Sequence, residues 1–501
     1  MQVDIYEPTE FDDLSVEELD LYHLIMEYRD EMGLSPIPLS AALTATAGRH
    51  VADTYYNMML EGQEYGELPD GSSGWPSGGN LHSWSDAPYF ADHSEPEVMW
   101  DAPERLGLDY PSAGYEISAA GYGSGAAALE GWKGSPDHNN VIINQDIWQD
   151  ISWEAIGVGQ LLNPEDQPGL TFQGNIFHVW FGADPDPEGP PVIAGTDGPD
   201  MITGTEFSDI IHPGGGNDTI TMNGGENNQV LLAGGDNTVW AGQGNIGDSR
   251  VEIQGHGDNT VGGGAGDDTL IVQGDGNNVL YGGADDDLIR INGDGNNTAW
   301  AGTGEDVIEI NGHGNNTVGG GPDDAMITIS GHGDNTVYGG GGQGANDILV
   351  TGDGDNLIFG GNSVGTDGNT ITIYGDGDNL IRNGPGDDTV IMSNEGQGDS
   401  TLMGSPGDDE FIFRPGTSGT VEFMPGDGHD TITGFDLSSD QYVDLSAFYT
   451  HPSQVDADIF SFPDEDGNAV IFIGGDEDQT LTIDIDPDVL ANADTDDWLI
   501  V

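Results

Sequence analysis

The strongest constraint on the fold of this 501-residue chain is a nine-residue repeat that begins at Gly195. Three consecutive units, at 195–203, 204–212 and 213–221, fit the pattern G-G-x-G-x-D-x-U-x, in which U is a large apolar residue. Glycine reaches positive φ values that other residues avoid, so the first half of each unit predicts a tight turn. The last three residues predict a short strand with U in the core. Consecutive units should therefore coil into a parallel β-roll.

Further along the chain the period becomes 19 residues, because each segment holds two nonapeptides and one extra residue. Each segment should make one turn of a two-sided coil, with a strand on each face. The segments, two of which are longer, begin at Gly255, Gly274, Gly293, Gly312, Gly331, Gly352 and Gly375. The two corners of a turn differ, since one carries Asp at the ligand position and the other carries Asn.

Stacked turns place like residues above one another. Buried carboxylates stacked in this way cannot all stay ionised without cations between them, whereas Asn can form a ladder of amide hydrogen bonds without metal. Turn carbonyls and carboxylates together favour a hard cation with many oxygen ligands, which means calcium. The predicted calcium ligands are Asp200, Asp209, Asp218, Asp268, Asp287, Asp306, Asp324, Asp388, Asp409 and Asp430. Only partial occupancy is expected at the other edge, which carries Asn259, Asn278, Asn297, Asn316, Asn335, Asn356 and Asn379.

Three histidines, His256, His313 and His332, share one turn position within Gly-His-Gly. A column of zinc sites is one interpretation. Exposed loop histidines are the interpretation that we favour.

The nonapeptide resembles the repeats-in-toxin (RTX) family of calcium β-rolls. That resemblance implies an RTX region at 195–414 and calcium as its cofactor. The segments after Phe411 resemble the capping module of serralysin-type proteases, and 415–501 would form this cap. The closing residues 496–501 resemble the uncleaved C-terminal signals of type I secretion substrates, although an ordinary closing strand is the alternative. The resemblance therefore implies export by the type I machinery and an extracellular or cell-surface location.

The charge of the chain disfavours some classes of binding partner. Lys and Arg total 8 against 90 Asp and Glu, a formal net charge of −82, which disfavours nucleic acid and anionic lipid. Calcium loading and adaptation to salt water both explain such acidity. There is no Cys, so disulfides are excluded, and no apolar run approaches the roughly 18–20 residues of a membrane span. The first residues show no cleavable secretory signal, which fits export by another route.

Residues 14–185 differ from the repeats, with fewer glycines and clear helical periodicity. Ser15 and Glu18 form a capping-box pattern before a helix that should end near Gly33, and Ser40 should cap a second helix. Strand-like runs occur at 156–159 and 176–181. We expect an α/β/α sandwich at 14–185, after a tail at 1–13 and before a Pro/Gly linker at 186–194.

Several stretches of this domain resemble the bacterial CAP (SCP-like) superfamily. They are 27–29, 81–83, 115–121, 131–140, 154–159 and 177–182. The resemblance places His82, Glu116 and His138 in a central cleft and implies an α/β/α fold that binds a small apolar ligand or a protein partner. The family's Gly-Glu-Asn reads Tyr115-Glu116-Ile117 here, and Ser135 stands where many eukaryotic members have a second Glu.

The chemistry of this trio leaves alternatives open. Two imidazoles and a carboxylate could hold zinc or another divalent metal, or act as general base and acid. No nucleophile motif and no H-E-x-x-H is present. We therefore expect a secreted calcium-binding RTX protein with a CAP-like binding domain, and lean against an enzyme. The alternatives are an extracellular hydrolase that uses His82, Glu116 and His138, and a surface or matrix structural protein.

Overall fold

The computed structural model describes residues 3–60, 79–90, 92–164, 167–242, 247–342, 344–362, 368–394, 398–455, 464, 466–475 and 478–501. The chain divides into two compact units, Met1–Gly214 and Gly215–Val501. Its fold is a β-solenoid of about 13 parallel turns, with an N-terminal α/β region and a C-terminal strand cap. The predicted fold class is confirmed. No helix among the described residues is long and apolar enough to cross a membrane.

The helices of the first unit begin where the sequence predicts. Ser15 caps α1 through a complete capping box with Glu18, and the side chain of Ser40 caps α2 by accepting the Leu43 N–H. The helical elements are α1 (Val16–Glu31), α2 (Ala41–Ala52), the π-helical η1 (Asp53–Leu60), α3 (Glu97–Trp100), α4 (Ala102–Arg105), α5 (Gly125–Lys133), α6 (Pro136–Ile142), η2 (Asp146–Trp148) and η3 (Thr171–Gly174).

A three-stranded antiparallel sheet, in the order β2-β4-β3, forms the centre of this unit. Its strands are β2 (Gly114–Ala120), β3 (Ala155–Leu162) and β4 (Asn175–Gly182). Helix α2 packs directly on β3, because a Cβ atom at Gly157 would lie 2.0 Å from the backbone of Leu43. This close approach fixes α2 against the sheet and buries His50 on its inner face. The unit also contains the short strands β1 (Leu14–Ser15), β5 (Val192–Ala194), β6 (Met201–Thr203) and β7 (Ile210–His212).

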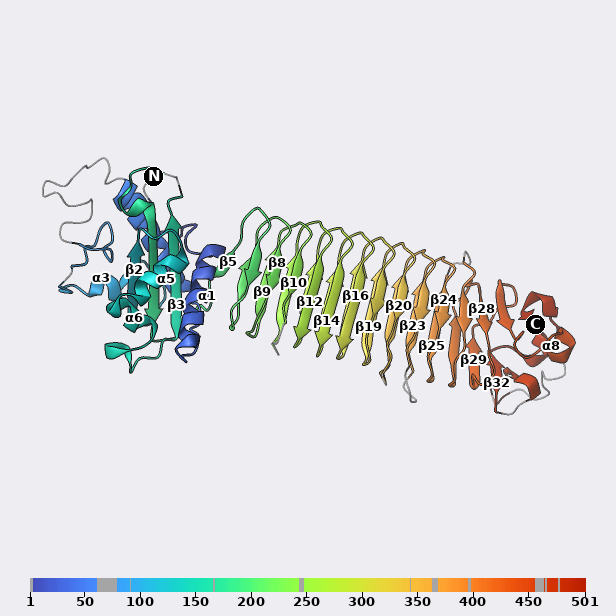
Figure 1. Ribbon diagram of the computed structural model, residues 1–501. Helices are drawn as coiled ribbons and strands as arrows, with labels where there is room; N and C mark the ends of the chain where they lie inside the picture. The colour runs from blue at the N-terminus through green and yellow to red at the C-terminus, as the bar shows by residue number, and fades with distance from the viewer. Residues whose placement is uncertain are drawn as a thin grey trace. The chain divides into compact units, whose positions relative to one another are not determined.

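The solenoid strands of the second unit stack in parallel as two sheets (Figure 1). One sheet contains β9 (Asn228–Leu232), β11 (Ser249–Ile253), β13 (Thr269–Val272), β15 (Leu288–Ile291), β17 (Asp306–Asn311), β19 (Ala325–Ser330), β21 (Asp347–Thr351), β23 (Thr370–Tyr374), β25 (Thr389–Ser393), β27 (Glu410–Phe413), β29 (His429–Thr433), β32 (Thr480–Ile483) and β31 (Ala469–Phe472). The other contains β8 (Thr219–Thr221), β10 (Thr238–Trp240), β12 (Thr260–Ala265), β14 (Val279–Ala284), β16 (Thr298–Thr303), β18 (Thr317–Gly319), β20 (Thr336–Tyr338), β22 (Leu357–Phe359), β24 (Leu380–Arg382), β26 (Thr401–Met403), β28 (Gly419–Glu422), β30 (Gln441–Asp444) and β33 (Leu499–Ile500).

The 19-residue period appears directly as strand register. Leu270 pairs with Ile289 one turn later, and Leu280 pairs in the same way with Ala299. These apolar side chains are fully buried, because each turn presents alternate residues to the interior. The hydrophobic column thus fixes the register of every polar corner between the strands.

The strand cap closes the second unit. Strand β31 pairs antiparallel with β32, and the terminal strand β33 pairs in parallel with β30. Trp498, next to β33, is fully buried, so the closing residues are part of the folded cap. The cap also contains α7 (Pro452–Val455), η4 (Ile473–Gly475), α8 (Pro487–Asn492) and η5 (Thr495–Asp497).

Candidate functional site

Two columns of buried polar residues run along the second unit, one at each corner of the coil. Within each column, a backbone N–H typically donates to the side-chain oxygen of the corresponding residue one turn later. The Asp column contains Asp268, Asp287, Asp306, Ala325, Asn346, Asn369, Asp388, Asp409 and Asp430. The Asn column contains Asn237, Asn259, Asn278, Asn297, Asn316, Asn335, Asn356, Asn379 and Ser400.

The Asn column satisfies itself by hydrogen bonds alone. The Oδ1 of Asn297 accepts both the backbone N–H and the side-chain amide of Asn278, each at 3.0 Å. The same amide of Asn278 also donates to the carbonyl of Gly276 at 3.0 Å. This pattern repeats from turn to turn, so the amide ladder that the sequence predicts leaves no buried charge for a cation to balance.

The Asp column has the same backbone hydrogen bonds but lacks the amide donor. The N–H of Asp268 donates to Oδ1 of Asp287 at 2.8 Å, and the N–H of Asp287 donates to Oδ1 of Asp306 at 2.9 Å. Where the column holds Asp, the second carboxylate oxygen then lacks a partner among the described residues, except in Asp409, whose Oδ2 accepts the N–H and the hydroxyl of Ser405 at 3.2 Å and 3.1 Å. This orphaned Oδ2 is buried in Asp268, Asp287, Asp306, Asp388 and Asp430.

Burial of these carboxyls raises their pKa values from an ordinary 3.8. Burial and the neighbouring Asp268 and Asp306 raise the pKa of Asp287 to about 8, and burial raises that of Asp268 to about 7. Burial likewise raises the pKa of Asp388 to about 7 and that of Asp430 to about 8, and in both cases Asp409 adds to the shift. The column therefore needs either protons or cations at neutral pH.

Glycine leaves space beside the orphaned oxygens. A Cβ atom at Gly282 would lie 2.4 Å from Oδ2 of Asp287 and 2.4 Å from the carbonyl oxygen of Ala301. A Cβ atom at Gly263 would lie 2.3 Å from Oδ2 of Asp268. Buried carboxylate oxygens beside main-chain carbonyls form a donor set of hard oxygens. That set fits calcium.

The Asp column is interrupted in the middle of the solenoid. Ala325 pairs in register with Asp306, and Asn346 and Asn369 follow it in the next two turns. The amide of Asn346 donates to Oδ1 of Asn369 at 2.9 Å, as in the Asn column. The structure thus places orphaned carboxylates in two blocks, with an amide-linked stretch between them. Asp324, a predicted ligand, lies one residue before the column position, and its exposed side chain accepts the Ala345 N–H at 2.8 Å.

The three earliest predicted ligands have hydrogen-bond partners, local ones for Asp200 and Asp209 and one in the next turn for Asp218. Oδ2 of Asp200 accepts the N–H of Thr196 at 2.6 Å, and Asp209 accepts both the N–H and the hydroxyl of Thr205. Burial raises the pKa of Asp209 to about 6. The N–H of Asp218 donates to Oδ1 of Asn237, so Asp218 lies at the start of the Asn column.

The turn histidines are exposed and serve as hydrogen-bond acceptors in the coil. Nδ1 of His256 accepts the N–H of Asp275 at 3.0 Å, and Nδ1 of His313 accepts the N–H of His332 at 3.0 Å. These bonds place the ring hydrogen of a neutral imidazole on Nε2. The rings of His313 and His332 stack at 5.1 Å. Exposed structural histidines account for this geometry.

A second site lies in the first unit, around the buried carboxylate of Glu116 on β2. Oε1 accepts from Nδ1 of His50 at 2.6 Å and lies 2.7 Å from Nδ1 of His178, and Oε2 lies 2.7 Å from Nδ1 of His82. The rings of His50 and His178 stack at 3.8 Å, and Trp84 covers the other face of His50. Glu116 is therefore the hub of a histidine cluster.

The hydrogen-bond partners assign the protons. Burial by itself would raise the pKa of Glu116, but His50 and His178 hold it well below its ordinary range, so it is a carboxylate. His50 faces this carboxylate through Nδ1 and the Ser83 carbonyl through Nε2, so both nitrogens must donate. Burial, assisted by His50, lowers the pKa of His178 to about 4. We therefore assign the single positive charge to His50, which pairs with Glu116.

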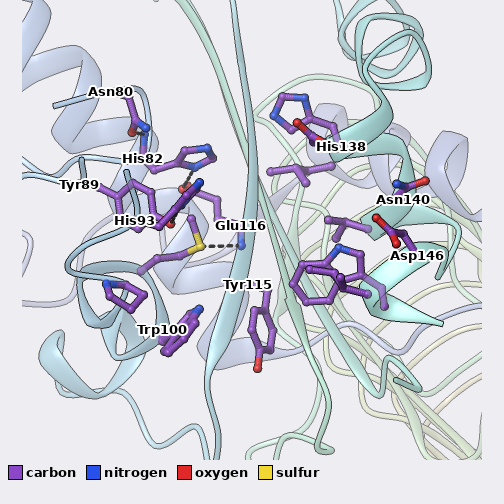
Figure 2. Close-up of a pocket in the computed structure, with 17 residues that line it drawn as sticks. Asn80, His82, Tyr89, His93, Trp100, Tyr115, Glu116, His138, Asn140 and Asp146 are labelled. Atoms are coloured by element: carbon purple, nitrogen blue, oxygen red, sulfur yellow. Dashed lines mark hydrogen bonds and ion pairs between the residues drawn. The ribbon is translucent and has the colours of Figure 1, made fainter. Parts of the chain in front are cut away.

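His82 and His138 line a pocket of about 550 Å³ together with Glu116 (Figure 2). Because Nδ1 of His82 donates to Glu116, its lone pair is on Nε2, which has no hydrogen-bond partner among the described residues. His138 is bonded instead to Ser135, with 2.9 Å between Nδ1 and Oγ, and burial lowers its pKa. The structure thus joins His82 and Glu116 directly and places His138 on the same pocket without a bond to either.

Among the described residues that line the pocket there is no Ser, Thr or Cys. The hydroxyl of Ser118 lies 3.1 Å from Nδ1 of His82 and 2.9 Å from Nδ1 of His178. Ser118 is itself buried, so it braces the cluster. Both oxygens of Glu116 are occupied by histidine, so it orients His82 and leaves Nε2 of His82 as the available donor atom.

Sequence reasoning missed His50 and His178, the two buried members of the cluster. With Glu116 they form a group whose potential ligand atoms lie within 4.8 Å of one another. His50 lies in the apolar face of α2, and His178 lies in the apolar strand β4. A polar residue within each otherwise buried element was the available signal.

Comparison with known families supports the interpretation of the solenoid. The chain carries four copies of the RTX calcium-binding nonapeptide repeat, at residues 194–228, 274–290, 291–309 and 342–363. These repeats imply that the solenoid binds calcium, which agrees with the orphaned carboxylates of Asp287 and Asp306 inside the matched segments. No curated protein matches the chain.

Proposed function

We propose that this RTX-type calcium-binding protein is exported through a type I route and folds when it meets calcium outside the cell. The observation that carries the proposal is the set of buried, orphaned carboxylate oxygens in the Asp column. Calcium bound to the folded state alone would stabilise it, by about 2.7 kcal/mol per independent site at a hundredfold excess over the dissociation constant. Export of an unfolded chain and folding in calcium would thus be coupled.

We further propose that the ligands are Asp268, Asp287 and Asp306 in one block and Asp388, Asp409 and Asp430 in the other. Each block spans three consecutive turns, so its carboxylates stack at strand spacing and bound cations would neutralise them. Calcium would supply positive charge and oxygen coordination between the turns. The Asn column would remain a hydrogen-bonded ladder.

The N-terminal domain is proposed to be a CAP-like binding module. The order of the CAP-like motifs in the sequence supports this, as does the pocket that His82, Glu116 and His138 line. The serralysin-like cap and the C-terminal export signal are part of the same proposal. The terminal strand of the cap, β33, would be accessible to an exporter only before the cap folds, because the adjacent Trp498 is buried in the folded state.

One observation favours a second candidate, a hydrolase or metal-assisted enzyme. The carboxylate of Glu116 orients His82 through Nδ1 and leaves its Nε2 as the available donor atom, as general bases and metal ligands require. His138 would be the second imidazole at this site. Turnover of ester or peptide substrates that is lost in His82→Ala but retained in His23→Ala, which changes a half-buried histidine on α1 outside the pocket lining, would establish this function.

A calcium titration of the full-length protein, followed by circular dichroism, tests the main proposal. A cooperative gain of β-structure near about millimolar calcium, absent with magnesium, is the expected result. A solenoid that is already fully folded in chelator at pH 8 would contradict calcium-dependent folding. Export is tested separately by co-expression with a type I exporter, and deletion of 496–501 should retain the protein inside the cell.

A further inference from the structure

The pocket beside Glu116 has an aromatic floor and rim. Tyr115 on β2 lies between Trp100 and Trp148, with ring centroids 6.4 Å and 5.2 Å away. The ring planes meet at 63° and 73°, and all three side chains line the same pocket. Figure 2 shows Trp100 and Tyr115 on one end of the pocket, away from His82 and His138. Such an arrangement offers several π-faces to one compact group.

The charge of the pocket has one sign. Its lining includes the carboxylates of Asp137 and Asp146, both on exposed residues, and contains no Lys or Arg among the described residues. The charge of Glu116 is already balanced by His50. The lining therefore carries unbalanced negative charge beside aromatic rings. A carboxylate or phosphate ligand would find no basic side chain here.

The loop that carries Asp146 is held in a strained backbone conformation. Asn144 has φ of 48° and Asp146 has φ of 55°, values that cost energy for residues other than glycine. The buried guanidinium of Arg29 on α1 fixes this loop, because it donates to the carbonyl of Ile142 at 2.5 Å and to Oδ1 of Asn144 at 2.7 Å. The fold thus maintains a costly conformation at the pocket rim, where Trp148 and Asp146 lie.

We propose that this pocket binds an organic cation that carries a methylated ammonium group. The methyl groups would pack against Trp100, Tyr115 and Trp148, whose π-faces attract a cation, and Asp146 would supply the opposite charge. The proposal rests on the binding function proposed for the N-terminal domain and specifies the chemical class of its ligand. An uncharged ligand of the same shape would gain the apolar contacts without the electrostatic attraction.

Choline is a suitable probe, because neopentylcarbinol is its uncharged isostere. Binding of both compounds to the full-length, calcium-loaded protein would be measured by isothermal titration calorimetry at moderate ionic strength. Choline should bind, and the dissociation constant of the isostere should be larger by a factor of about ten or more. Equal binding of the two compounds would overturn the assignment of a cation and leave a general apolar binding cleft intact.

Two variants locate the site. Trp148→Ala and Asp146→Asn should each weaken choline binding about fivefold or more, whereas Asp150→Asn, which changes an exposed carboxylate outside the lining, should not. Choline binding that none of the variants alters would place the cation elsewhere on this acidic protein and overturn the proposal. Circular dichroism of each variant in calcium checks that the fold is retained, and Trp148→Phe provides an aromatic replacement if Trp148→Ala does not fold.

Discussion

The backbone N–H of Asp268 donates to Oδ1 of Asp287, one turn later, across 2.8 Å, and Oδ2 of Asp287 is left without a partner among the described residues. The corresponding pair at the other corner, Asn278 and Asn297, makes the same backbone bond and adds an amide bond of 3.0 Å. The two corners therefore differ by a single donor group per turn. That difference decides which corner requires a cation.

Replacing one buried carboxylate should remove calcium binding without removing the backbone ladder. In Asp268→Asn the new amide can bond to Asp287, as Asn369 bonds to Asp388 at 2.8 Å in the same column. We expect fewer bound calcium ions by titration calorimetry and a smaller loss of stability on chelation. Asp267→Asn is the matched control, because Asp267 is exposed and, within the part of the chain that the structure describes, its Oδ1 accepts the Asp286 N–H alone. An unchanged calcium stoichiometry in Asp268→Asn would argue against the Asp column.

Without calcium, the solenoid should be more stable at acidic pH. Burial raises the pKa values of Asp287 and Asp430 from 3.8 to about 8, so in this range the folded state binds more protons than the unfolded state. Their stabilising contribution is complete below pH 3.8 and is lost as the pH rises towards 8. The midpoint of thermal unfolding in chelator should fall between pH 5.5 and pH 8.5.

Calcium should reduce this pH dependence, because a bound cation keeps the carboxylates ionised. The triple variant Asp268→Asn, Asp287→Asn and Asp306→Asn should reduce it as well. That variant separates the column from general repulsion among exposed carboxylates, which it leaves in place. A chelated protein that is more stable at pH 8.5 than at pH 5.5 would contradict the assignment.

Removing the charge of Glu116 should destabilise the N-terminal unit. In Glu116→Gln the buried ring of His50 loses the carboxylate that balances its charge, and breaking a buried pair of this kind costs about 3–5 kcal/mol. Thermal unfolding followed by tryptophan fluorescence measures the change. Glu154→Gln is the control, because Glu154 is exposed and, among the described residues, its side chain accepts a hydrogen bond from the Ser152 hydroxyl alone. Equal midpoints for the two variants would show that the cluster carries no buried charge.

An aromatic ladder on one outer face of the solenoid depends on a glycine. A Cβ atom at Gly319 would lie 2.2 Å from the indole ring of Trp300, which stacks with Tyr338 at 5.9 Å. In Gly319→Ala we expect Trp300 to turn towards solvent, with a red shift of its fluorescence and a loss of about 1 kcal/mol. Gly341→Ala should have no such effect, since a Cβ atom there meets nothing within 4 Å. If the emission maximum does not shift in Gly319→Ala, Trp300 stays in the stack, and the ladder does not depend on this glycine.

The repeat pattern was enough to predict the solenoid, because the information in a repeat is local and periodic. Turn glycines, a buried apolar residue and a polar corner recur every 19 residues, so the strands β13 to β17 and their register follow from spacing. Capping residues likewise fixed the start of α1 at Ser15. The amide ladder at the Asn corner could also be predicted from sequence, because Asn recurs at the same position of each repeat.

Tertiary structure alone decided the details of both sites. The predicted ligand Asp324 lies 18 residues after Asp306, and the strand register puts Ala325 in the column, so the side chain of Asp324 is exposed outside it. The cluster around Glu116 needs a helix and two strands from distant parts of the chain, with His50 and His178 stacked at 3.8 Å. A periodic pattern predicts neighbours one turn away. The motifs indicated that His82, Glu116 and His138 share a cleft, but the contact of His50 with Glu116 depends on how α2 packs on the sheet.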